Sequence, residues 1–195
     1  MKLNRILARA AVVPVVVGSA FLAASPASAH VSVAASSTAA GSSSILTFSV
    51  PHGCDGSATN KIAIKMPEDI LTVTPTRNAF YDVKTVKQQL DEPVTDAHGN
   101  TLTERVSQIV YSAKTPLPDG QRDTFELSVS LPDAEGETLA FPVIQSCVKG
   151  QTAWTERAAE GQDGEKLAGE ELAGEELESP APLVMITAPE EGDDG

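Results

Sequence analysis

Short segments in which apolar and polar residues alternate strictly are the feature that most restricts how this chain can fold. In the clearest segment, residues 125–131, the apolar positions are Phe125, Leu127, Val129 and Leu131, and polar residues stand between them. Successive side chains of a β-strand point to opposite faces of a sheet, so this period of two predicts a strand with one buried face. Shorter segments of the same kind occupy residues 45–50, 61–66, 70–74, 101–113, 139–144 and 183–187. The chain is therefore expected to be rich in antiparallel β-structure.

The residues between these segments favour turns rather than helices. Pro, Gly, Asp and Asn separate the predicted strands, and the sequence contains no convincing long amphipathic helix. Residues 96–100 lie between two candidate strands and have the composition of a hairpin turn. About seven to nine short strands predict an all-β fold, namely an antiparallel β-sandwich of immunoglobulin or cupredoxin type.

The N-terminal segment has the three parts of a secretory signal peptide. Lys and Arg residues precede an apolar stretch at 10–24, and a small-residue cleavage site follows at 27–29. The apolar stretch, about 15 residues long, is short for a membrane-spanning helix. We expect residues 1–29 to be a signal peptide that is removed after Ala29. The mature protein is then exported, to the extracellular space or the outer face of the cell membrane.

Acidic residues are numerous and unevenly distributed. They outnumber basic residues by 27 to 14, which gives a formal net charge of −13 and makes nucleic acid an improbable partner. Much of the excess lies in residues 160–195, where Leu-Ala-Gly-Glu-Glu occurs twice in tandem. Frequent glycine and dense like charge oppose a stable helix. We expect a sandwich domain at 30–188 that carries a flexible acidic loop at about 160–179, followed by an acidic disordered end at 189–195.

Cys54 and Cys147 are the only cysteines in the chain. Oxidising surroundings outside the cell favour a disulfide between them. In the chain-entropy model a loop of this length stabilises the fold by on the order of 4.6 kcal/mol. The alternative, a cysteine that binds copper, is disfavoured because no His-Cys-Met grouping is present.

Cleavage after Ala29 makes His30 the mature N-terminus. A free N-terminal histidine offers its α-amine and its imidazole Nδ1 together, and both can bind one metal ion in a six-membered chelate ring. Such nitrogen donors suit Cu(II), which also has the highest affinity in the divalent series. The alternative interpretation is that His30 follows the cleavage site by chance and has no such role.

Several segments, taken together and in order, resemble the YcnI-like family of exported copper-binding domains. They are residues 30–33, 48–54, 61–67, 117–125, 141–147, 152–154 and 180–182, and the resemblance spans roughly residues 30–188. The resemblance implies a β-sandwich that holds one Cu(II) through the amine and imidazole of His30. It also implies that Trp154 lies near the metal and that an acidic residue assists. Trp154 has a plainer alternative role as a core packing residue.

The acidic ligand is less clearly marked in this chain. Gln121 stands where some relatives have Glu. Asp123 has the same strand parity as the apolar residue Phe125, so its carboxylate is expected at the inner rim of the sandwich. We therefore predict Asp123 as the additional ligand. Its alternative role is to cap the turn after Gly120.

Two other histidines are weaker candidates. Asp96 and His98 form an Asp-x-His pair like that of the CopC class of exported copper-binding proteins, but they lie within the predicted turn. His52 lies beside the predicted disulfide, and as a ligand it would make a two-histidine brace like that of copper monooxygenases. The sequence alone predicts that binding depends on His30 and not on His52 or His98.

The motifs of common enzyme classes are missing from the sequence. It has no nucleophile elbow, no His-Glu-x-x-His, no phosphate-binding glycine loop and no Cys-x-x-Cys. We therefore expect a copper carrier, buffer or chaperone in copper homeostasis rather than an enzyme, with a membrane copper transporter or another copper carrier as partner. The alternatives are a copper-dependent redox enzyme and a surface β-sandwich without metal.

Overall fold

The computed structural model describes residues 30–95, 99–157 and 177–190, and all regular secondary structure in them is β. The eleven strands are β1 Ser32–Ala35, β2 Ser43–Val50, β3 Thr59–Lys65, β4 Val73–Pro75, β5 Tyr81–Thr95, β6 Thr101–Leu117, β7 Asp123–Ser130, β8 Thr138–Ala140, β9 Val143–Cys147, β10 Gln151–Trp154 and β11 Leu183–Met185. No helix in these described ranges is long and apolar enough to span a membrane.

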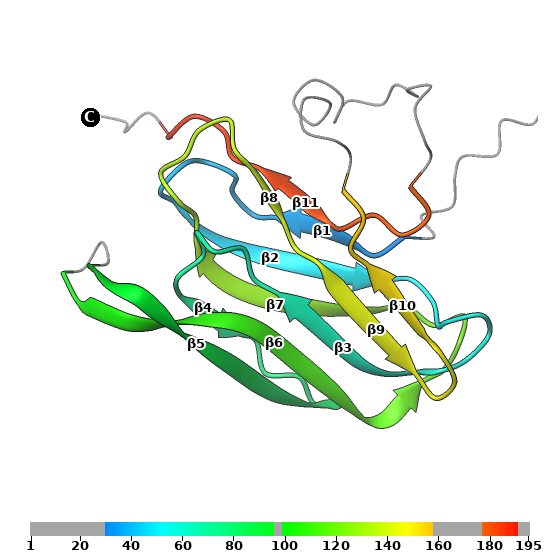
Figure 1. The fold of residues 1–195 in the computed structure, drawn as a ribbon. Helices are drawn as coiled ribbons and strands as arrows, with labels where there is room; N and C mark the ends of the chain where they lie inside the picture. Colours follow the sequence, from blue (N-terminus) through cyan, green and yellow to red (C-terminus); the bar gives the residue numbers. More distant parts are fainter. Residues whose placement is uncertain (1–29, 96–98, 158–176, 191–195) are drawn as a thin grey trace, which may run out of the picture.

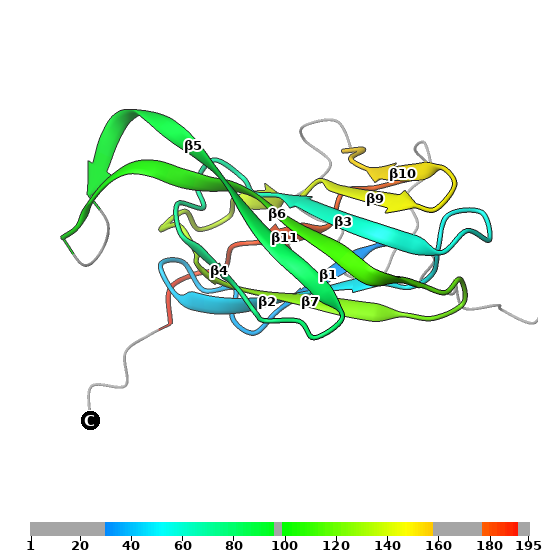
Figure 2. The ribbon, with the colours of Figure 1, turned by 90° about the horizontal axis from the view of Figure 1, so that it is seen from below.

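The strands form two large antiparallel sheets that pack face to face (Figures 1 and 2). One sheet has the order β1-β2-β7-β4, and the other has the order β10-β9-β3-β6-β5. A small pair, β11-β8, completes the structure. In Figure 2 the two large sheets appear as separate layers, with the core between them. The predicted antiparallel β-sandwich is therefore confirmed.

The core follows from the alternation seen in the sequence. In β2 the buried residues Leu46, Phe48 and Val50 alternate with more exposed ones, and in β7 Phe125, Leu127 and Val129 do the same. Phe48 meets Phe141, which precedes β9, with ring centroids 5.6 Å apart in an edge-to-face arrangement. Each large apolar side chain removed from water contributes about 1.5–3 kcal/mol, so this shared inner face holds the two sheets together.

The number of strands exceeds the seven to nine expected, for a physical reason. β5 has a mostly exposed burial pattern, so it lacks the apolar alternation that marks a strand in the sequence. It pairs with β6 from Tyr81 opposite Ala113 to Thr95 opposite Thr101, so the two strands form a long antiparallel pair. The predicted strand at 139–144 is divided between β8 and β9.

Several sequence-based expectations concern residues outside the described ranges. They are the signal peptide at 1–29, most of the acidic loop expected at 160–179, most of the acidic end at 189–195, and the Asp96–His98 pair.

Candidate metal centre

His30 and Trp154 come together at one end of the sandwich. His30 lies just before β1 and is exposed, whereas Trp154 is the last residue of β10 and is buried. Their ring centroids are 5.8 Å apart with an interplanar angle of 62°. Two residues that were predicted to share a site, from distant parts of the chain, are therefore neighbours.

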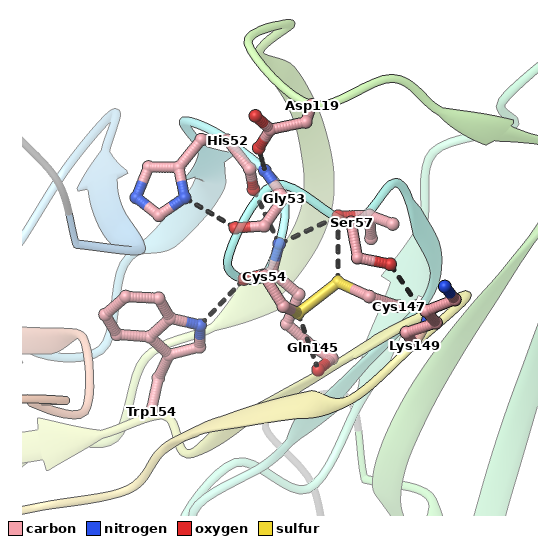
Figure 3. The surroundings of a disulfide bond; sticks show 10 residues. His52, Gly53, Cys54, Ser57, Asp119, Gln145, Cys147, Lys149 and Trp154 are labelled. Carbon is pink, nitrogen blue, oxygen red and sulfur yellow. Dashed lines mark hydrogen bonds between the residues drawn. A yellow bond between two sulfur atoms is a disulfide. The ribbon is translucent and has the colours of Figure 1, made fainter.

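A buried glutamine holds Trp154 in place (Figure 3). The Trp154 Nε1 donates a hydrogen bond of 3.0 Å to Oε1 of Gln145, which is fully buried on β9. The Gln145 Nε2 donates to the carbonyl oxygen of His52 at 2.6 Å and to Oγ1 of Thr59 at 2.8 Å. Because every polar atom of a buried amide needs a partner, Gln145 fixes the indole and the His52 backbone relative to each other.

Residues 52–57 form a turn that we call the His52 turn. The disulfide of Cys54 anchors this turn. Cys54 and Cys147 are bonded with their Cα atoms 6.0 Å apart, which confirms the predicted bridge. The backbone N–H of Cys54 donates to Ser57 at 3.0 Å, and the N–H of Ser57 donates back to Cys54 at 2.8 Å. The turn is therefore tied both to itself and to β9.

Gly53 allows this turn to form. A Cβ atom at Gly53 would come within 2.1 Å of the carbonyl oxygen of Ser57, which is far closer than atoms can approach. The Gly53 N–H donates to Oδ1 of Asp119 at 3.0 Å. A larger residue at this position would push the turn off its hydrogen-bonding partners and displace His52.

The His52 imidazole has a defined hydrogen-bonding role. Its Nδ1 lies 2.6 Å from the carbonyl oxygen of Gly53. A carbonyl oxygen only accepts, so Nδ1 is the donor in this contact. We call His30, His52, Gln145 and Trp154 the polar corner.

Sequence reasoning gave His52 little weight, although a signal for it existed. His30 lies two residues before β1 begins, and His52 lies two residues after β2 ends. The two strands pair antiparallel with Ser32 opposite Ser49, so continuing the register places His30 opposite Pro51 and next to His52. The sequence alone did not show that β1 and β2 pair with each other.

Asp123, the predicted additional ligand, lies at the same end of its sheet as His30 but on a different strand. It begins β7 opposite Val50, and β2 separates β7 from β1. Its Oδ1 accepts the backbone N–H of Thr124 at 2.8 Å. Burial, and after it the Asp123 carboxylate, raises the pKa of Tyr81. The structure thus places Asp123 beside Tyr81 of β5, two strands from His30.

Within the described ranges, no group of three or more His, Cys, Asp or Glu side chains is placed to hold a metal ion. Backbone and terminal groups, which are not among these side chains, can also bind a metal ion. The α-amine that cleavage would create at His30 is such a donor. Together with the imidazole it supplies two nitrogens from one residue.

Comparison with known protein families decides where this chain belongs. The family described as "Domain of unknown function (DUF1775)" matches residues 30–186. The chain belongs to the DUF1775 family. The YcnI-like family carries this name, so the family resemblance seen in the sequence is confirmed. The DUF1775 match begins at His30, the residue expected to become the mature N-terminus.

A solved structure supports the fold of this DUF1775 domain. A crystal structure of an uncharacterized protein from Nocardia farcinica, with an immunoglobulin-like fold, is similar with a TM-score of 0.60 and 23% identity. The match covers 81% of this chain and 98% of that one. A protein from Corynebacterium diphtheriae described as membrane anchored matches with a TM-score of 0.36 and 11% identity, over 59% of this chain and 28% of that one. Comparison with curated proteins gives no match.

Proposed function

We propose that this DUF1775 domain is an exported copper-binding protein. It holds one Cu(II) through the α-amine and the imidazole Nδ1 of a mature N-terminal His30. The observation that carries the proposal is the contact between the exposed His30 and the buried Trp154, whose ring centroids are 5.8 Å apart. An indole beside the metal would exclude water from one side of it.

The donor chemistry of the polar corner favours copper. An amine and an imidazole on one residue bind as a chelate, and nitrogen donors prefer Cu(II) to the harder ions Mg²⁺ and Ca²⁺. Trp154 keeps a fixed place because its N–H is bonded to Gln145. The position of the aromatic neighbour is therefore set before the metal arrives.

Exposure favours a carrier, buffer or chaperone over an enzyme. His30 is exposed while Trp154 is buried, so a bound ion would be covered on one side and open on the other. An open side allows another copper carrier or a membrane copper transporter to supply or remove the ion by ligand exchange. A copper-dependent redox enzyme and a sandwich without metal are the competing functions, and oxygen-dependent activity or failure to bind would favour one of them.

The decisive experiment separates the amine from the imidazole. The protein is prepared with His30 as its first residue, and a second form carries one additional glycine before His30. The first form is expected to bind one Cu(II) per chain in calorimetric titration and paramagnetic resonance. The extended form and His30→Ala are expected to lose most of the affinity, whereas His98→Ala retains it. Undiminished binding by the extended form would overturn the proposal.

Asp123 stays a predicted ligand and has its own test. If its carboxylate binds the metal, Asp123→Asn lowers the affinity for Cu(II) at least about tenfold, as the loss of a ligand should. If its main partner is Tyr81, the affinity changes little and the tyrosine titration changes instead. Both quantities can be measured on the same preparation.

A further inference from the structure

We propose that two copies of this chain associate through the free edge of β5. Residues 81–85 of one copy pair with the same residues of a second copy, antiparallel and about a two-fold axis. The five-stranded sheets of the two copies then form one continuous sheet. This inference concerns an interaction surface and does not rest on copper binding.

The strand β5 lies at one margin of its sheet (Figures 1 and 2). In the order β10-β9-β3-β6-β5 it is bonded to β6, and no strand in the described ranges pairs with its other edge. Such an edge presents a row of backbone N–H and C=O groups to which another strand can bind. With 15 residues, β5 is long enough to accept one.

Features that protect an edge against pairing are concentrated in the second half of β5. Proteins block free edges with bulges and proline, among other devices. The register with β6 shifts between Val86 and Lys87 and again between Gln89 and Val94, and Pro93 lies in this half. From residue 81 to residue 86 the register is regular. The regular half is therefore the part that can accept another strand.

A hydrogen bond at the start of β5 shows which of its backbone groups face outward. The N–H of Lys114 donates to the C=O of Phe80 at 2.9 Å, so the Phe80 carbonyl faces β6. Along a strand, the backbone groups of successive residues point to alternate edges. Because the register is regular, the N–H and C=O groups of Tyr81, Val83 and Thr85 point to the free edge.

A contact on the other edge of β6 gives the same result. The N–H of Met66 donates to the C=O of Ser107 at 3.0 Å, so the odd-numbered residues that follow Ser107 face β3 and the even-numbered ones face β5. In the described ranges, no hydrogen bond outside the strand ladders involves the backbone of residues 81, 83 or 85. An open groove of about 540 Å³ lies beside these three residues and the segment 75–79. The outward-facing groups are therefore accessible.

The charges of this half of β5 are complementary to themselves. When Val83 lies opposite its own counterpart, Tyr81 lies opposite Thr85, and these residues form the hydrogen-bonded pairs. Asp82 of each copy then lies opposite Lys84 of the other in non-hydrogen-bonded pairs, where side chains approach most closely. Both side chains are exposed. Opposite charges in such pairs stabilise a sheet.

The same charges exclude the neighbouring registers. A shift by two residues in one direction places Asp82 opposite Asp82, and a shift in the other direction places Lys84 opposite Lys84. Like charges directly opposite each other destabilise a sheet. The sequence of β5 therefore favours one antiparallel register between two copies.

The exposed ring of Phe80 supports a second copy as the partner. Phe80 is 72% exposed, the highest value among the large apolar side chains of the described ranges. In the favoured register it lies opposite Val86 of the second copy, on the same face as Asp82 and Lys84. Contact between these side chains removes apolar surface of both copies from water.

The two-fold pairing uses the β5 edge of both copies, so association ends at a dimer. The polar corner lies at the β10 end of the strand order, and β5 is at the opposite end. A second copy bound at β5 therefore leaves His30 open.

The test measures the mass of the mature protein by analytical ultracentrifugation at concentrations up to about 1 mM. We expect a monomer–dimer equilibrium. Asp82→Lys and Lys84→Asp each place like charges opposite each other, so each should weaken the dimer at least about tenfold. An equal mixture of the two variants should associate again, because each copy then meets the opposite charge. Lys149→Asp, at an exposed position in the β9–β10 turn, is the matched control and should leave the dimer unchanged.

A proline substitution tests the backbone pairing. Val83→Pro removes an N–H that faces the free edge and none that bonds to β6, so this variant should remain monomeric. If Val83→Pro does not fold, the charge variants decide, because their side chains are exposed. A monomer at every concentration overturns the proposal. A dimer that Lys84→Asp does not weaken also overturns it, since its interface then lies elsewhere.

Discussion

The polar corner at the β10 edge of the five-stranded sheet is held by hydrogen bonds and a disulfide, whereas the β5 edge of the same sheet is held by packed aromatic rings. In this aromatic cluster, Phe125 of the facing sheet lies 4.7 Å from the ring of Tyr111 and 5.0 Å from that of Tyr81. All three rings are almost fully buried. Burial of apolar side chains stabilises the fold but is not directional. Hydrogen bonds are directional, so they fix the positions of particular atoms.

The two regions therefore have different effects. The aromatic cluster stabilises the fold, and the polar corner fixes the positions of particular side chains. The aromatic cluster spans both sheets and makes one side-chain hydrogen bond to the backbone, from Tyr111 Oη to the Glu126 carbonyl oxygen at 3.3 Å. The polar corner has a buried amide with three partners, next to a covalent bridge. We infer that damage to the cluster lowers stability alone, and that damage to the corner also lowers copper affinity.

The largest effect is expected from Phe125→Ala. Removing a buried aromatic ring costs about 3–5 kcal/mol of unfolding free energy, because the cavity lies between the two sheets. Denaturant titration measures this loss. Copper affinity of the folded fraction should be unchanged, since Phe125 packs against Tyr81 and Tyr111 at the β5 edge of the facing sheet. A loss of copper affinity in folded Phe125→Ala would contradict the separation of the two regions.

Replacing both cysteines by serine should cost about 2–5 kcal/mol of unfolding free energy. The double variant avoids a single reactive thiol. The His52 turn then loses its covalent tie to β9, so we expect copper affinity to fall severalfold as well. Denaturation and Cu(II) titration of the same sample test both effects. If stability falls and affinity does not, the disulfide does not help to position the polar corner.

Gln145→Leu should lower the free energy of unfolding by about 1–3 kcal/mol for each buried group that it leaves without a partner. Those groups are the Trp154 N–H and the His52 carbonyl. Unlike the aromatic substitution, this one should also shift the tryptophan emission, because the indole is the only one in the chain. Gln121→Leu is the matched control, since Gln121 is exposed. Equal behaviour of the two variants would show that Gln145 has no positioning role.

The smallest effect concerns the tyrosines of the aromatic cluster. Burial raises the pKa of Tyr111 to about 12 and, with Asp123, raises that of Tyr81 further. The unfolded chain loses these protons near pH 10, so their contribution to stability is complete below pH 10 and is lost as pH rises toward 12. Absorbance at 295 nm should show no tyrosine ionisation near pH 10 in the folded protein.

Asp123→Asn refines that titration. Removing the carboxylate charge beside Tyr81 should lower its pKa toward the value set by burial alone. Tyr111 is the internal control, because burial and Glu126 raise its pKa. An unchanged Tyr81 titration in Asp123→Asn would show that the two side chains do not interact.

The sequence by itself determined the fold class and half of the candidate site. Alternation in residues such as Phe125 and Leu127 predicted the sandwich because a strand with one buried face must alternate. The count of two cysteines predicted the disulfide. The position of His30 after a predicted cleavage site, with the family resemblance, predicted that it lies near Trp154.

Tertiary structure alone decided the rest. Strand parity predicted that Asp123 faces inward, but not which strand of the other sheet it meets, and that strand is β5 with Tyr81. The strand β5 was not predicted, because its residues are mostly exposed and show no apolar alternation. It is a strand because it pairs with β6. His52 and Gln145 acquired their roles only when β1 paired with β2 and β9 with β10, because pairing partners are set by contacts between segments far apart in the chain.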